Sequence, residues 1–346
     1  MVDFQEVKLE GVVVHLVGNK GRQEGTRASS SLLALEGNNQ FLMLDYFLSN
    51  LKFDETYCLS HPTDYAQNVV AEACRSIFKN TDTLYPNSKL LLQHLYDYST
   101  HPNTKAGEMY VAFFKDVLLD DELVDAVGIF KAETKDTFCL LQPVDGGDWS
   151  VNFSQGSSTD KLDKGVLIFN TMADDGYRVI TTKTVGKNNG YYFTDDFLRL
   201  VLVKDDMFKT KHVMGMVKGF INEVIGQDTQ LDYQIEMSKK AVDYFNKREQ
   251  FDYNEFKDDV FGDNQEQKKK LDYYRKNIEE LDDIDSDGFF IAPTAVKKLQ
   301  KSFRDTIKMD TGFELKVKDT QDENLVRGFD EEKQMFYYQV FFNQEA

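Results

Sequence analysis

Long cationic side chains are concentrated in one C-terminal stretch of the sequence, residues 292–318. Seven basic residues stand there against three acidic ones: Lys297, Lys298, Lys301, Arg304, Lys308, Lys316 and Lys318. On a helix that ran that far, Lys297, Lys301, Arg304 and Lys308 would project from one face. On a strand, Lys316 and Lys318 would point to the same side. Such side chains suit phosphate oxygens, whose contacts need little sequence-specific geometry. The stretch therefore predicts a nucleic-acid contact. The alternative is a solvated charged face, because 29 % of the residues are charged.

A second candidate for phosphate binding is the glycine-rich loop 18–25, which carries Lys20 and Arg22 and is followed by Arg27. Glycines let backbone amides approach a phosphate closely. The loop lacks the residue order of a nucleotide-binding P-loop, because Thr26 follows Gly25 directly. The alternative interpretation is an ordinary mobile surface loop.

Two acidic patterns could hold Mg²⁺ in a nuclease, in which a carboxylate works with a Glu-x-Lys segment of a strand. They are Asp125 with Glu133 and Lys135, and Asp310 with Glu314 and Lys316. In a chain this rich in charge, the Glu-x-Lys spacing arises readily by chance. We therefore expect no enzyme activity, no catalytic residue and no cofactor, and keep the nuclease as a further alternative.

No convincing metal-ligand pattern is present. Residues 283–288 (DIDSDG) fit the first half of a calcium loop, but Thr294 stands where the bidentate glutamate should be, and Pro293 before it suits helix entry. We interpret the run as an acidic loop between helices. The histidines form no HxH or HxxxH pair: His15, His61, His94, His101 and His212. His94 shares a helix face with Leu91 and is expected in the core, so no metal is predicted.

Bulk properties point to a reduced, cytoplasmic protein. The three scattered cysteines, Cys58, Cys74 and Cys139, are expected to be small buried hydrophobic residues without disulfides. The N-terminus has no signal-peptide pattern, and no apolar run is long enough to span a bilayer, so no membrane association is expected. The net charge of −18 counts against simple coating of DNA, yet a local basic patch remains possible because salt screens distant charges.

The elements that must position these residues indicate an α+β fold. We predict an antiparallel-sheet-rich domain over residues 1–190, and a mainly helical domain over 191–346 that ends in a small antiparallel sheet. Strands are expected over residues 7–17, 111–119, 123–130, 137–142, 166–169 and 177–185. Two helices, capped by Asp64 and Ser88, separate the first two strands.

The second half is predicted from helical spacing. One helix carries Val213 through Ile225, and others are expected over 232–245, 254–261 and 265–281. Pro293 suits the first position of a further helix over 294–302. The tail returns to strands near 313–317 and 335–342, and the aromatic residues of the last strand predict at least one well-buried face.

An ordered series of segments resembles a known family. The segments are residues 12–20 (VVVHLVGNK), 125–131 (DAVGIFK), 162–170 (LDKGVLIFN), 295–298 (AVKK) and 327–330 (RGFD), with Tyr337 and Tyr338 near the end. Together they are similar to bacterial nucleoid-associated proteins of the NdpA type, in the form found in Bacteroidetes. The resemblance implies association with the nucleoid and, in some members, with type II topoisomerases. It transfers no catalytic or DNA-contacting residue.

The sequence thus predicts a non-catalytic DNA-binding protein of the cytoplasm and nucleoid, with a homodimer possible. The main alternative is an acidic adaptor that reaches DNA indirectly, through a partner such as a type II topoisomerase.

Overall fold

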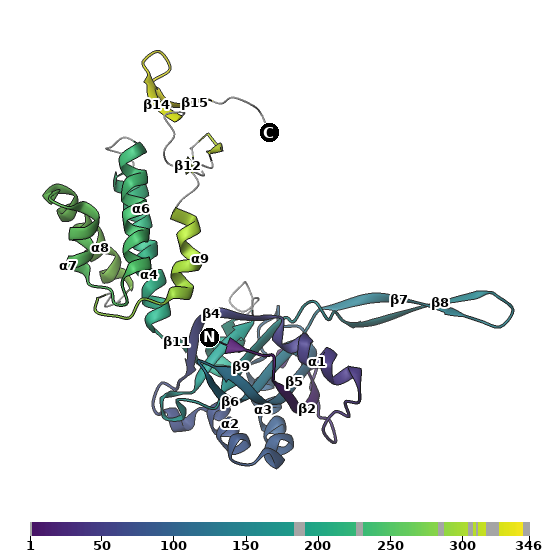
Figure 1. Cartoon of the computed structure of the whole chain (residues 1–346). Helices are drawn as coiled ribbons and strands as arrows, with labels where there is room; N and C mark the ends of the chain where they lie inside the picture. The colour runs from purple at the N-terminus through teal and green to yellow at the C-terminus, as the bar shows by residue number, and fades with distance from the viewer. Residues whose placement is uncertain are drawn as a thin grey trace. The chain divides into compact units, whose positions relative to one another are not determined.

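The computed structural model describes residues 2–182, 191–225, 231–282, 287–303, 307–308, 311–315 and 325–341. The chain forms two compact units, Met1–Val203 and Lys204–Ala346 (Figure 1). The first contains a large antiparallel sheet and the second is helical with short C-terminal hairpins, which confirms the predicted α+β class.

The described strands of the first unit build a nine-stranded sheet in which neighbouring strands pair antiparallel. Its strands are β1 (Val2–Asp3), β2 (Lys8–Val17), β3 (Thr26–Arg27), β4 (Leu51–Leu59), β5 (Gly107–Leu119), β6 (Glu122–Ala132), β9 (Lys164–Phe169), β10 (Arg178–Thr182) and β11 (Leu200–Leu202). The order is β11-β4-β10-β9-β6-β5-β2-β3, with β1 beside β5. The last residues of the strand predicted over 177–185 lie outside the described part.

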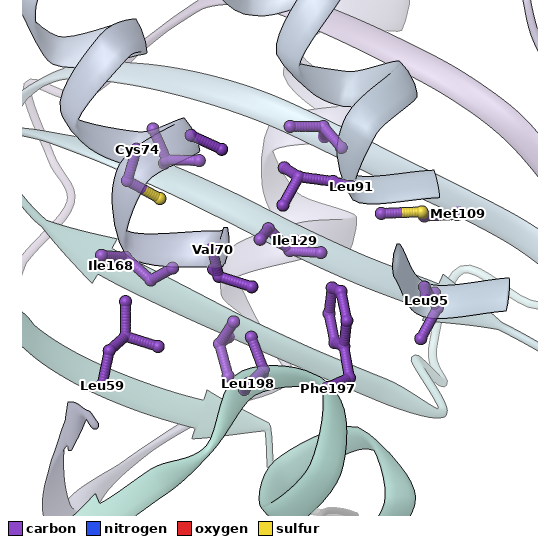
Figure 2. Packing of buried hydrophobic residues seen from close by; sticks show 14 of the residues in the cluster. Leu59, Val70, Cys74, Leu91, Leu95, Met109, Ile129, Ile168, Phe197 and Leu198 are labelled. Carbon is purple, nitrogen blue, oxygen red and sulfur yellow. The ribbon is translucent and has the colours of Figure 1, made fainter. Parts of the chain in front are cut away.

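Both faces of this sheet are covered, so its central strands bury apolar side chains on both sides. Along β5, Val111 and Phe113 enter one core while Ala112 and Phe114 enter the other, as alternation along a strand requires. The first core lies beneath α2 and α3, as Figure 2 shows. On the opposite face Phe47 stacks on Phe130, with ring centroids 4.5 Å apart.

The helical elements of the first unit start at different residues from those predicted. They are α1 (Asn38–Leu48), α2 (Val69–Lys79), α3 (Leu84–Tyr98), the short turns η1 (Tyr65–Gln67), η2 (Thr81–Thr83) and η3 (Ala173–Asp175), and the π-helix η4 (Tyr192–Leu198). Asp64 caps η1, whereas Asn68 caps α2 by accepting from the Ala71 amide at 2.9 Å. Ser88 does not start α3, because the helix already begins at Leu84. Ser88 is buried inside the helix, where its hydroxyl donates to the Tyr85 carbonyl.

The first unit extends past residue 190, where the sequence placed the domain boundary. Phe193 and Phe197 of η4 are fully buried in the core beneath α2 and α3. Strand β11 then pairs with β4. These contacts attach residues 191–203 to the sheet, while residues 183–190 lie outside the described part.

The second unit is built from helices around an aromatic core. They are α4 (Asp206–Phe220), the π-helical turn η5 (Ile221–Ile225), α6 (Leu231–Lys247), α7 (Tyr253–Phe261), α8 (Gln265–Asp282) and α9 (Pro293–Phe303). The predicted helices are confirmed within a few residues, because their apolar residues recur at helical spacing and meet in one cluster.

Two hairpins end the described chain: β12 (Ile307–Lys308) with β13 (Glu314–Leu315), and β14 (Leu325–Asp330) with β15 (Met335–Val340). The expected buried face of the last strand is wrong. Phe336 is 62 % exposed, because β15 pairs with β14 alone among the described strands and none of the described residues covers this face.

One hairpin of the first unit stands apart from the large sheet. Among the strands that the structure describes, β7 (Lys135–Pro143) and β8 (Trp149–Ser157) pair only with each other, and they project as an arm (Figure 1). Every residue of β7 is exposed. The prediction that all three cysteines are buried is therefore wrong for Cys139, which lies on this arm; Cys74 is buried, Cys58 is partly buried, and all three are free thiols.

Candidate nucleic-acid interface

Helix α9 presents the part of the predicted basic stretch that the structure describes. Pro293 occupies its first position, where a missing backbone N–H costs nothing. Ala295 and Val296 are buried against the helical core, and Leu299 and Phe303 pack partly against it. This apolar stripe fixes the orientation of the helix and sets its opposite side toward solvent.

Three lysines share that solvent-facing side. Lys297, Lys298 and Lys301 are exposed, and helical geometry places them within about 100° of arc. Lys297 and Lys301 are one turn apart, and neither forms an ion pair with any described acidic residue. We call these three residues the lysine face.

The side chains of the remaining basic residues of the predicted stretch are not described, so their place on the surface is not defined. Arg304, Lys316 and Lys318 lie outside the described residues. Lys308 lies in β12, and only its backbone is described. The lysine face is therefore the part of the prediction with a defined geometry.

The cations of the loop 18–25 are already engaged within the protein. Lys20 pairs with Asp97 at 2.7 Å. The Arg22 guanidinium donates to the Glu24 carboxylate and to the carbonyls of Pro102 and Thr104. These contacts attach the loop to the end of α3 and to the segment after it.

Arg27 belongs to the edge strand β3, where it pairs in register with Leu16 of β2. Its side chain is exposed. Of the three cations predicted around the loop, Lys20 and Arg22 form ion pairs with nearby carboxylates, whereas Arg27 forms none with a described residue.

The first nuclease pattern is not assembled. Asp125 lies in β6 and Glu133 follows the other end of that strand, a separation of about 26 Å at ~3.3 Å per residue. Lys135 pairs with Glu108. In the second pattern, Asp310 and Lys316 lie outside the described residues, and the side chain of Glu314 is not described.

Glu133 belongs instead to a buried charge cluster that the sequence did not reveal. Its carboxylate contacts Lys131 Nζ at 2.9 Å and Lys164 Nζ at 2.8 Å. The Tyr192 hydroxyl donates to Glu133 Oε1, and Lys131 also donates to the Lys105 carbonyl. We call Lys131, Glu133, Lys164 and Tyr192 the buried charge cluster. The only signal in the sequence is a lysine at the end of each of two otherwise apolar strands.

The cluster shifts the proton affinities of its members. Burial alone would raise the pKa of Glu133, but the two ammonium groups outweigh it and lower that pKa. Burial lowers the pKa of Lys131, against the pull of Glu133. Because each charge is paired, the arrangement joins β6 to β9 rather than offering a reactive group.

Within the described ranges, no group of three or more His, Cys, Asp or Glu side chains is arranged to hold a metal ion. Residues 283–286 of the calcium-like run lie outside those ranges. Asp287 uses its carboxylate to accept from the Tyr253 amide at 3.0 Å. His94 is partly buried, and its Nε2 bonds with the Phe197 carbonyl at 3.1 Å, as a packed core residue would.

Comparison with known proteins identifies a family. A family model described as nucleoid-associated protein YejK matches residues 13–336, nearly the whole chain. No curated protein matches the sequence. Among the helices that the structure describes, none is long and apolar enough to cross a membrane.

Proposed function

Because this chain belongs to the nucleoid-associated protein YejK family, we propose that it acts at the bacterial nucleoid as a non-catalytic DNA-binding protein. The lysine face of α9 is the proposed contact. The observation that carries the proposal is the exposure of Lys297, Lys298 and Lys301 on one side of a helix whose other side is buried.

Electrostatics supports this choice of site. A cation that contacts phosphate must first leave any acidic partner, which costs free energy. Lys20 and Arg22 already have such partners, whereas Lys297 and Lys301 have none among the described acidic residues. The face is also small, which fits weak binding without sequence preference by a protein of net charge −18. Arg304, Lys308, Lys316 and Lys318 would extend it along the chain.

Reversing the three charges together, in Lys297→Glu/Lys298→Glu/Lys301→Glu, is expected to weaken DNA binding at least about tenfold at low salt. Each lost phosphate contact should also lower the slope of log K against log salt by about 0.9, hence by roughly 2.7 for three. Fluorescence anisotropy of a labelled duplex, titrated at several salt concentrations, measures both quantities.

A matched variant controls for net charge. Lys79→Glu/Lys239→Glu/Lys269→Glu changes the total charge equally, at three exposed lysines on three different helices. It should lower affinity far less than the α9 variant. Equal losses in the two variants would show that only overall charge matters and would remove the lysine face as the contact.

The charge of −18 also favours a second candidate, an adaptor that reaches the nucleoid through a basic DNA-handling partner such as a type II topoisomerase. It predicts no anisotropy change with naked DNA and salt-sensitive binding to the purified topoisomerase. Binding to DNA alone that disappears in the α9 variant would reject this adaptor.

We further propose that the two compact units are separate domains, close to the predicted 1–190 and 191–346. Each unit encloses its own hydrophobic core, which is the usual property of an independently folding domain.

A further inference from the structure

The arm formed by β7 and β8 has two chemically different faces. Residues directly opposite each other in an antiparallel pair share a face, and the register pairs Cys139 with Phe153, Leu141 with Val151, and Pro143 with Trp149. These six residues form one continuous face, which we call the apolar arm face. The other face pairs Phe138 with Ser154 and Leu140 with Asn152, so it is half polar.

The apolar arm face is open to solvent. Trp149 is 68 % exposed and Phe153 is 70 % exposed. A two-stranded hairpin is at best marginally stable alone in water, and a contiguous exposed apolar patch marks an interaction site. These properties mark the face as a candidate interaction surface.

The charge of the arm argues against DNA as that partner. No lysine or arginine occurs between Lys135 and Lys161, and Asp145 and Asp148 lie in the turn at the tip. DNA binding by an arm depends on cations that neutralise phosphates, even where apolar side chains wedge between bases. An uncharged face instead suits another apolar protein surface.

A pocket of about 530 Å³ lies at the base of the arm. Its lining residues are Leu42, Met43, Tyr46, Glu108, Tyr110, Lys135, Gln155, Gly156, Ser157 and Thr159. Lys135, Gln155 and Ser157 are on the same side of the hairpin as the apolar arm face, so the pocket continues that face.

We propose that the arm pairs with the arm of a second copy of this chain, antiparallel and face to face, with the Trp149 of each copy in the base pocket of the other. The two arms are equally long, about 30 Å for nine residues, so antiparallel packing brings each tip to the partner's base. The indole N–H of Trp149 needs an acceptor when buried, and Glu108, Gln155 and Ser157 of the pocket lining carry side-chain oxygens.

Area and charge both favour a second copy. Trp149 and Phe153 alone bury roughly 300–500 Å² when covered, and four further side chains bring each partner near the ~800 Å² of a standard interface. The contact is isologous, as expected of a two-fold dimer. It also joins two chains of charge −18 through a face that carries no charge, which limits their repulsion.

Two adjacent leucines supply the test, because they lie on opposite faces of the arm. Sedimentation equilibrium of the full chain should give a dimer. Leu141→Asp, on the apolar arm face, should weaken dimerisation at least about 100-fold, since each dimer carries the change twice. Leu140→Asp, on the other face, should leave a dimer. A monomeric wild type, or equal effects of the two variants, would overturn the proposal.

Two native residues, Trp149 and Cys139, test whether the two arms pack antiparallel. Trp149 is the only tryptophan of the chain, so its emission should shift to shorter wavelength as the protein is concentrated and the dimer forms. Cys139 is the middle residue of β7, so a two-fold axis through the paired arms passes beside it. A short bis-maleimide should link two chains, and Cys139→Ser should abolish the link. Unchanged linking in that variant, or a concentration-independent emission, would reject the antiparallel arrangement.

Discussion

Glu133→Gln is expected to lower the free energy of unfolding by about 3–5 kcal/mol. The substitution keeps the shape of the side chain but removes the negative charge between Lys131 and Lys164, whose side chains are 0 % and 7 % exposed. Two buried ammonium groups then lack their counter-charge, and an uncompensated buried charge costs several kcal/mol. Urea unfolding at neutral pH measures the loss.

Glu108→Gln is the matched control. Glu108 pairs with Lys135 at the base of the arm, but its side chain is 24 % exposed, so the loss should stay below about 1 kcal/mol. Similar losses in both variants would mean that the buried charge cluster is well solvated and unimportant for stability.

The same cluster makes stability depend on acid. The pKa of Glu133 is lower in the folded protein than the ordinary value of about 4.3. Its contribution is therefore complete above that value and is lost as the pH falls through the lowered pKa of the folded state. Wild-type stability should fall more steeply below about pH 4.3 than that of Glu133→Gln. Parallel pH profiles for the two proteins would contradict the assignment.

Gly176→Ala is expected to lower the free energy of unfolding by about 2–5 kcal/mol. Gly176 has φ of +96°, and an added Cβ would collide with the carbonyl oxygen of Leu59. The backbone cannot move away, because the Gly176 carbonyl accepts from the Leu59 amide at 2.7 Å. Overpacking costs about 1–3 kcal/mol, and a left-handed conformation costs alanine roughly 1–2 kcal/mol more. Thermal or urea unfolding measures the sum.

Gly25→Ala separates these two contributions. Gly25 has a similar φ of +73°, but no atom lies within 4 Å of an added Cβ. Its variant should lose only about 1 kcal/mol. If Gly25→Ala were as destabilising as Gly176→Ala, backbone conformation alone would explain both losses.

Periodicity predicted the elements that have an unambiguous buried side. Strands β5, β6 and β9 and helices α6 to α9 follow the sequence closely, because each buries a continuous apolar face or stripe. Helix α1 and strand β4 were missed, since residues 38–59 show neither period clearly. The start of α2 was displaced because Asp64 and Asn68 are both good caps, and only the fold shows that Asp64 caps η1 instead.

The candidate site was less predictable, because a sequence lists charges without their partners. Lys297 and Lys20 are the same residue type in the sequence, yet of the two only Lys20 forms an ion pair with a described aspartate. Glu133 and Lys135 suggested a metal site, but the strand directions give each of them a different counter-charge. The apolar arm had the same difficulty: an apolar strand predicts burial without indicating which surface provides it.

The composition of the arm makes it a substrate for chymotrypsin but not for trypsin. Trypsin cleaves after lysine and arginine, so it has no site between residues 136 and 160, although this segment is among the most exposed of the first unit. Chymotrypsin cleaves after aromatic residues and leucine, and it finds Leu141, Trp149 and Phe153 there. Early chymotryptic cleavage within residues 136–160, without a tryptic counterpart, should therefore reveal whether the arm stands free.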